Sequence, residues 1–167
     1  SLKRKNLNLN KMSRIVCFGE VLWDVFRTHK KIGGAPLNVA LRLNSFGNHV
    51  NIISSVGDDP DGKEIIDFIE GNAITSQEVQ VNEVFKTSQV KVVLDKNGSA
   101  SYNIEFPCAW DYIGLRESAK EIVKQADAFI FGSLVTRNEV SRNTLFSLLK
   151  LANFKVFDVN LRAPHYT

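Results

Sequence analysis

The sequence predicts an α/β protein in which a parallel sheet carries helices on its faces and a small second sheet lies beside it. Two observations support this prediction. Apolar strand segments alternate along the chain with segments whose apolar residues recur at helical spacing. Between residues 87 and 106 this alternation gives way to two short segments with the two-residue periodicity of exposed strands.

The strands of the main sheet are predicted from short apolar runs. Such runs are typical of strands that are buried on both faces, as parallel strands are. Because helical segments separate them, neighbouring strands are expected to run parallel through crossover connections. The four runs are residues 15–18, 50–56, 129–131 and 156–159.

Helices are predicted wherever apolar residues fall on one face at a spacing of three or four. The first helix follows Pro36, which suits a first helical position because it lacks an N–H, and it ends near Gly47. The second follows Pro60. The apolar faces are Leu37, Ala40 and Leu41; Ile65, Phe68 and Ile69; Ala119, Ile122, Val123 and Ala126; and Val140, Leu145, Leu148, Leu149 and Ala152.

The small sheet is predicted as a hairpin, residues 88–94 and 100–106, with its turn at residues 96–98. A hairpin inserted into an α/β unit is expected to pack its apolar face against another part of the protein. Residues 21–31 are short and partly apolar, so they can pair with the hairpin and complete a separate sheet. The alternative is a peripheral hairpin that packs on its own domain.

Composition and charge exclude several classes of protein. A chain of 167 residues that is 44% hydrophobic and 23% charged can fold around its own core without a disulfide or a metal. No apolar run approaches the roughly 20 residues that span a bilayer, so no membrane partner is expected. The net charge of +3 comes from the first 14 residues, which hold five basic residues and no acid. We therefore interpret residues 1–13 as a basic leader that is disordered or not part of the native protein, with Met12 as a native start, and predict no nucleic-acid partner.

The cysteines and histidines suggest no metal site. Cys17 and Cys108 stand alone, without a paired spacing, which is typical of a reducing compartment and predicts a cytoplasmic protein. The histidines at positions 29, 49 and 165 also lack metal-ligand spacing.

The run from Gly33 to Asn38 is the most informative motif. Two glycines without Cβ atoms can adopt positive φ, act as a hinge and let a ligand approach the main chain closely. Asn38 then offers a side-chain donor and acceptor on the first turn of the following helix. Taken alone, the diglycine is equally well explained as a tight turn into a helix.

Several motifs together resemble the amino-terminal part of the ribokinase/PfkB-type sugar kinases, and the fructokinases most of all. The motifs are GE-x-L-x-D at residues 19–24, GGAPLN at 33–38, AWD at 109–111 and D-x-N-L-R at 158–162, and they follow one another in the order found in that family. The resemblance covers residues 14–167. It implies a ribokinase-like fold, present here only in part, with the small sheet as a lid over the sugar and in many members as a dimer clasp.

The resemblance also implies the sugar-binding residues. Asp24 matches the aspartate that binds sugar hydroxyls, and a carboxylate can accept hydrogen bonds from two neighbouring hydroxyls. Gly34 and Asn38 match residues that contact the sugar, with Gly33 beside them as a hinge. A turn or capping aspartate is the alternative interpretation of Asp24.

Aromatic residues add weaker candidates. Tyr102 and Phe106 are predicted lid contacts, although strand packing within the hairpin explains them equally well. Trp23 and Trp110 could stack on a sugar, but ordinary core positions are favoured.

At the far end of the match, Asp158, Asn160 and Arg162 are predicted on the phosphate side of the site. They alternate where the last strand runs out of apolar residues, and Arg162 is a candidate stabiliser of the transferring phosphoryl group. A surface salt bridge is the alternative.

The predicted function is the ATP-dependent phosphorylation of a sugar hydroxyl, with fructose as the leading substrate and ATP and Mg²⁺ as the implied cofactors. The family's late Gly-Ala-Gly-Asp motif, which supplies the catalytic base, does not occur in this sequence, so no catalytic residue is predicted within it. We therefore expect a truncated kinase or fragment. Two alternatives stay open: a non-catalytic module for sugar binding or dimerisation, and a kinase for another sugar, a nucleoside or a ketodeoxy sugar acid.

Overall fold

The main sheet has five strands, and every neighbouring pair runs parallel. The structure is a computed structural model that describes residues 12–94 and 100–161. The first strand of the chain lies in the middle of the sheet, because the order is β5-β4-β1-β8-β9. In that order the strands are β5 (Val79–Asn82), β4 (His49–Gly57), β1 (Arg14–Phe18), β8 (Ala128–Gly132) and β9 (Lys155–Asp158).

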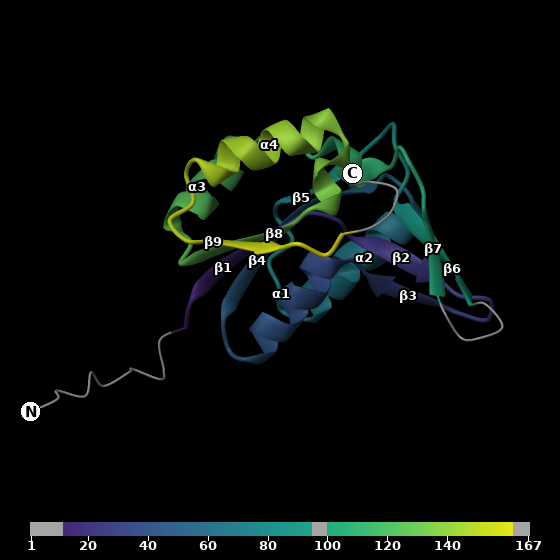
Figure 1. The fold of residues 1–167 in the computed structure, drawn as a ribbon. Coiled ribbons are helices and arrows are strands. Elements are labelled where there is room, and N and C mark those ends of the chain that lie inside the picture. Colours follow the sequence, from purple (N-terminus) through teal and green to yellow (C-terminus); the bar gives the residue numbers. More distant parts are fainter. Residues whose placement is uncertain (1–11, 95–99, 162–167) are drawn as a thin grey trace, which may run out of the picture.

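Helices cover both faces of this sheet, two on each side (Figure 1). Alternate residues of β1 divide between the two cores, since Val16 and Phe18 pack with α3 and α4 whereas Ile15 and Cys17 pack with α1 and α2. This alternation follows from the two-residue period of a strand. The helices are α1 (Ala35–Ser45), α2 (Pro60–Gly71), α3 (Glu117–Gln125) and α4 (Glu139–Leu149), with short 3-10 helices η1 (Ala109–Tyr112) and η2 (Leu134–Arg137).

A second, four-stranded sheet stands at one side of the main sheet (Figure 1). We call it the lid sheet. Its inner strand β2 pairs antiparallel with β3 and parallel with β6, and β6 pairs antiparallel with β7. The predicted partnership between residues 21–31 and the hairpin is therefore confirmed. The lid strands are β3 (Lys30–Gly33), β2 (Leu22–Val25), β6 (Ser88–Leu94) and β7 (Ala100–Ile104).

The predicted fold class, a parallel α/β sheet with flanking helices and a small separate sheet, is confirmed, and the differences from prediction are local. The first helix begins at Ala35, so Pro36 is its second residue, where its missing N–H still costs nothing. Strand β5 was not predicted. Phe68 and Val140, which were assigned to buried helix faces, are 36% and 42% exposed. Val159 and Phe106 lie just beyond the strands that were expected to contain them.

Strand β9 is an edge strand among the described residues, because it pairs only with β8. Its side chains are poorly covered, and Val156 and Phe157 are 37% and 53% exposed. Beyond the strand, Val159 and Leu161 are also exposed. An apolar strand edge with free hydrogen-bonding groups favours pairing with another chain.

No helix in residues 12–94 and 100–161 combines the length and the apolar character that a membrane crossing needs.

Candidate functional site

A cavity of about 250 Å³ lies between the lid sheet and the carboxyl ends of the main strands. Ligand crevices in open α/β sheets usually form at this end, because the loops that follow parallel strands meet there. Residues just beyond β1, β8 and β9 all reach this cavity. Its lining is Glu20, Leu22, Asp24, Gly34, Ala35, Asn38, Val90, Tyr102, Ile104, Leu134 and Asn160. We call it the lid pocket.

Asp24 enters the lid pocket from β2, opposite Lys31 on β3. Its side chain is half-buried, and burial raises the pKa of its carboxyl group, while the nearby charge of Lys31 acts in the opposite direction. A Cβ added to Gly33 would lie 2.5 Å from Asp24 Oδ2. Gly33 therefore leaves the space that the Asp24 carboxylate occupies.

Gly34 connects the lid sheet to helix α1 and has a φ of +110°, which favours glycine. A side chain at this position would collide with the carbonyl oxygen of Glu20. The backbone N–H of Asn38 donates to the carbonyl of Gly34 at 2.9 Å, which is the first hydrogen bond of α1. This turn of helix holds Asn38 at the wall of the lid pocket.

Glu20 also lines the lid pocket, and sequence reasoning did not single it out as a site residue. It follows β1 and is only 4% exposed. Burial raises the pKa of its carboxyl group to about 7, an effect that hydrogen bonds from the backbone amides of Glu20 and Ala35 reduce. The available signal was its position, since an acidic residue directly after a buried strand falls at the ligand-binding end of the sheet.

The two predicted aromatic lid contacts differ in position. Tyr102, on β7, lines the lid pocket and is 52% exposed. Phe106 does not belong to that lining. It is 58% exposed and its ring lies against the guanidinium of Arg137, 5.1 Å from ring centroid to Cζ.

Two of the three residues predicted on the phosphate side, Asp158 and Asn160, lie at the end of β9. Asn160 lines the lid pocket, and Asp158 is close enough to Glu20 for its negative charge to raise the pKa of that carboxyl group. Arg162 lies outside the described residues. The structure therefore brings Asp24, Gly34, Asn38, Tyr102 and Asn160 together around one cavity.

The Ala109-Trp110-Asp111 motif belongs to the core instead of the lid pocket. Trp110 and Asp111 are fully buried, and Trp23 is also buried, so the core interpretation of both tryptophans holds. Asp111 accepts hydrogen bonds from Nε and Nη2 of Arg137 at 2.7 and 2.8 Å. Arg137 also lies over the Trp110 ring and donates to the carbonyl of Glu105 at the end of the lid.

The lid pocket has an acidic and neutral lining. Glu20 and Asp24 are its acidic residues, and no Lys, Arg or His occurs among the described residues that line it. Such a lining suits the hydroxyl groups of a small neutral ligand, whereas an anionic ligand would meet two carboxyl groups. The described residues contain no cluster of three or more His, Cys, Asp or Glu that could hold a metal ion.

The two cysteines do not form a reactive site. Both are free and buried. Burial raises the pKa of Cys17 to about 12, and burial together with the charge of Asp111 raises that of Cys108 to about 12. Thiols with such pKa values are poor nucleophiles at neutral pH.

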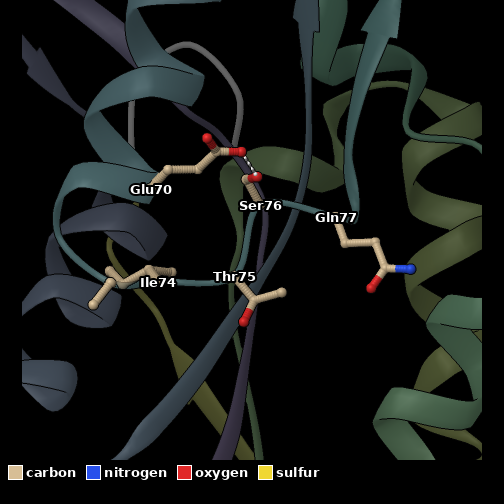
Figure 2. A pocket seen from close by; sticks show the side chains of 6 residues that line it. Glu70, Ile74, Thr75, Ser76 and Gln77 are labelled. Atoms are coloured by element: carbon tan, nitrogen blue, oxygen red, sulfur yellow. Dashed lines mark hydrogen bonds between the residues drawn. The ribbon is translucent and has the colours of Figure 1, made fainter.

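A larger hollow, of about 500 Å³, lies at the opposite end of the sheet, beyond the carboxyl end of α2. Figure 2 shows that Ser76 points to Glu70, to which it donates a hydrogen bond, whereas Gln77 points away from both. Thr75 forms an isolated β-bridge with Asn51, near the start of β4. This hollow therefore lies at the amino ends of the strands, whereas the lid pocket lies at their carboxyl ends. None of the residues predicted for sugar binding lines it, so we take the lid pocket as the candidate site.

Comparison with known families and proteins shows which proteins this chain is similar to. The sequence pattern described as pfkB family carbohydrate kinase matches residues 4–167. A putative sugar kinase of Pyrococcus horikoshii is 32% identical over 144 residues, which cover 84% of this chain and 46% of that protein. A probable fructokinase of Arabidopsis thaliana is 28% identical over 167 residues, covering 90% and 49%. The chain thus spans about half the length of these curated relatives.

Solved structures of sugar kinases resemble the fold closely. The crystal structure of the Pyrococcus horikoshii sugar kinase superposes with a TM-score of 0.85 at 28% identity, covering 92% of this chain and 55% of that one. The Halothermothrix orenii fructokinase gives a TM-score of 0.83 at 20% identity, covering 92% and 60%, and this likeness concerns the fold alone.

Proposed function

This chain belongs to the pfkB family of carbohydrate kinases, and on that premise we propose that it forms the sugar-binding part of a kinase that phosphorylates a hydroxyl of a neutral sugar, with fructose as the leading substrate. The lid pocket carries this proposal, because it gathers Asp24, Gly34 and Asn38 at the carboxyl ends of the main strands. Similarity to probable fructokinases supports fructose as the first sugar to test.

Each proposed residue has a role that follows from sugar chemistry. The Asp24 carboxylate would accept hydrogen bonds from two adjacent hydroxyls, and the Asn38 amide would donate to or accept from a third. Gly33 and Gly34 leave room for Asp24 and for the Glu20 carbonyl, so they shape the pocket wall. Tyr102 would close the site from the lid, and Phe106 would act through its stacking on Arg137.

The acidic lining favours a neutral substrate over a ketodeoxy sugar acid. A carboxylate on the ligand would approach Glu20 and Asp24 without a cationic partner among the described lining residues. Like charges at short range raise the free energy of binding. Fructose, ribose and nucleosides carry no such charge, so all three stay compatible with the site.

We propose ATP as the phosphoryl donor, because the related Pyrococcus horikoshii sugar kinase has been crystallised in complex with ATP. Family membership implies Mg²⁺ as well. The described residues do not fit either group, since they offer no cluster of metal ligands and no cation at the lid pocket. We therefore assign no phosphoryl-transfer step to these residues, and we place Asp158, Asn160 and Arg162 on the phosphate side of the sugar only as a proposal.

Calorimetric titration with fructose, alongside a coupled assay of ATP turnover, tests this function. We expect fructose to bind, and Asp24→Asn to weaken binding at least about tenfold, as the loss of a charge-assisted hydrogen bond implies. Asp67→Asn, an exposed carboxylate paired with Lys63 on α2, is the matched control. Equal fructose affinity in Asp24→Asn, or tighter binding of a ketodeoxy sugar acid than of any neutral sugar, would contradict the proposal. Turnover would show that this chain itself supplies the catalytic parts.

A non-catalytic sugar-binding or dimerisation module is the second candidate, and the two lid-sheet edges that are open within the described residues favour it. Strands β3 and β7 form the two edges of the lid sheet within the described part of the chain, so a second copy could add to either edge. We propose the lid as the surface of a homodimer, which light scattering coupled to size-exclusion chromatography would detect. Two free, buried cysteines support a cytoplasmic location.

A further inference from the structure

Glu20 leaves one carboxylate oxygen without a partner in the wall of the lid pocket. Its Oε2 is buried and accepts no hydrogen bond within the described structure. Burying a carboxylate oxygen without a hydrogen bond costs free energy, and folded proteins rarely accept that cost without a reason. A ligand hydroxyl in the pocket would supply the missing donor.

The other interactions of Glu20 hold its carboxyl group in place. Backbone amides of Glu20 and Ala35 donate to the carboxylate, and the Ala35 amide belongs to the first turn of α1. The N-terminus of a helix favours negative charge, and Gly34 offers no side chain to cap it. Glu20 is thus oriented by its amide partners while Oε2 stays available.

Charged groups on two neighbouring elements act on Glu20, and a third acidic residue shares its pocket. Arg137 on η2 favours the ionised form, and Asp158 at the end of β9 disfavours it. Asp24 on β2 lines the same pocket. Arg137 Nη1 is also buried without a hydrogen-bond partner in the described structure. Burial is the largest influence, and it raises the pKa of Glu20 to about 7.

We propose that Glu20 is a further sugar-contacting residue of the lid pocket, whose ionised carboxylate accepts a hydrogen bond from a hydroxyl of the bound sugar, so that sugar binding releases a proton from the protein to the solvent. This inference rests on the proposed function, since it requires a neutral sugar in the pocket. The hydroxyl keeps its own proton, and the proton that leaves comes from the fraction of Glu20 that is protonated before binding. No covalent bond of the sugar changes.

Titration calorimetry of fructose at pH 7, in two buffers with different ionisation enthalpies, measures this proton directly. The difference between the two apparent enthalpies, divided by the difference between the two ionisation enthalpies, gives the number of protons released. We expect about half a proton per sugar at pH 7, because a group with a pKa near 7 is about half protonated there. Affinity should rise as the pH increases from 6 to 8.

Glu20→Gln separates this role from a purely structural one. Glutamine keeps an oxygen for the amides of α1 but cannot ionise, so proton release should vanish and fructose affinity should fall roughly tenfold or more. Glu78→Gln is the matched control: Glu78 is 2% exposed and also has an unpartnered buried Oε2, but it does not line the lid pocket. It should leave proton release and affinity as in wild type. Thermal unfolding of each variant checks that it is folded.

The possible outcomes are distinct. If fructose binding is lost in Asp24→Asn but Glu20→Gln retains wild-type affinity and proton release, this inference is wrong and the proposed function stands. If the wild-type protein binds fructose without releasing a proton, the inference is also wrong. If wild type binds neither fructose nor ribose, the proposed function fails and this inference fails with it.

Discussion

Gly33 on β3 and Asp24 on β2 are diagonal neighbours across the β2–β3 pair, so close that a Cβ on Gly33 would lie 2.5 Å from Asp24 Oδ2. Its neighbour Gly34 has a positive φ and lies against the carbonyl of Glu20. The two glycines are thus required for different reasons. Gly33 leaves space for the Asp24 side chain, and Gly34 leaves space for the Glu20 backbone. Changing each in turn separates binding from stability.

Gly33→Ala is expected to weaken sugar binding more than it weakens folding. The new methyl group would displace the Asp24 carboxylate, which is the end of a side chain and can rotate, so the cost in stability should stay within about 1 kcal/mol. Fructose affinity should fall at least about tenfold, because the displaced carboxylate loses a charge-assisted hydrogen bond. Calorimetry and urea unfolding measure the two quantities. Unchanged affinity would show that Asp24 does not bind from its observed position.

Gly34→Ala is expected to destabilise the protein by about 1–3 kcal/mol. A positive φ is strained for alanine, and the new Cβ would collide with the backbone of Glu20, which cannot move aside. Gly71→Ala is the control for adding a methyl group. A Cβ there meets nothing within 4 Å and φ is ordinary, so stability should stay within about 1 kcal/mol of wild type. Equal effects of the two substitutions on urea unfolding would contradict the assignment of strain to Gly34.

The diglycine illustrates what the sequence could and could not predict. Its place at the start of a helix was predictable, because glycine, proline and an apolar helical face are local signals, whereas its contact with a sugar was implied by the family resemblance and stays a prediction. The reason for each glycine was not, since the contacts with Asp24 and Glu20 exist only after β2 and β1 have folded. Glu20 was missed for the same reason: its unusual chemistry comes from burial.

Strand β5 was missed for a different reason. Val79–Asn82 has only four residues, of which Val79 is 7% exposed and Val81 is 52% exposed. Two apolar residues in four are too few to separate a strand from a loop by periodicity. What fixes this segment is pairing with β4, a long-range contact that no local pattern reveals. The longer strand at residues 50–56, which holds four apolar residues in seven, was predicted correctly.

Stability is expected to fall as the pH rises from about 4.5 to above 7, because of Glu20. Its pKa rises from 4.5 to about 7 in the folded state through burial, so the folded protein holds this proton more tightly than the unfolded chain. The stabilisation is complete below pH 4.5 and is lost as the pH passes 7. Glu20→Gln cannot ionise, so without sugar it should exceed wild type in stability at pH 8 by up to about 3 kcal/mol, and by much less at pH 5. Urea unfolding at both pH values tests this, and parallel profiles would contradict it.

Removing only one partner of the buried ion pair between Asp111 and Arg137 is expected to lower the stability of the protein strongly. Their side chains are 0% and 3% exposed, and the Nε–Oδ1 distance is 2.7 Å. Asp111→Ala leaves a buried guanidinium without its carboxylate, which should cost about 3–5 kcal/mol in urea unfolding. The double variant Asp111→Ala/Arg137→Met removes both charges and should be more stable than Asp111→Ala alone. If the two substitutions add, the pair is not coupled as the geometry indicates.

We expect this chain to self-associate through the β9 edge, because β9 carries exposed apolar residues and has only one strand partner among the described residues. Val156 is 37% exposed on this edge, so Val156→Lys places a charge where an incoming strand would pair, which natural sheets use to block such contacts. Light scattering over a concentration series should show less association than in wild type. Val140→Lys is the matched control, because Val140 is 42% exposed on α4, away from the edge. Equal reduction by both variants would mean that net charge, and not the β9 edge, governs association.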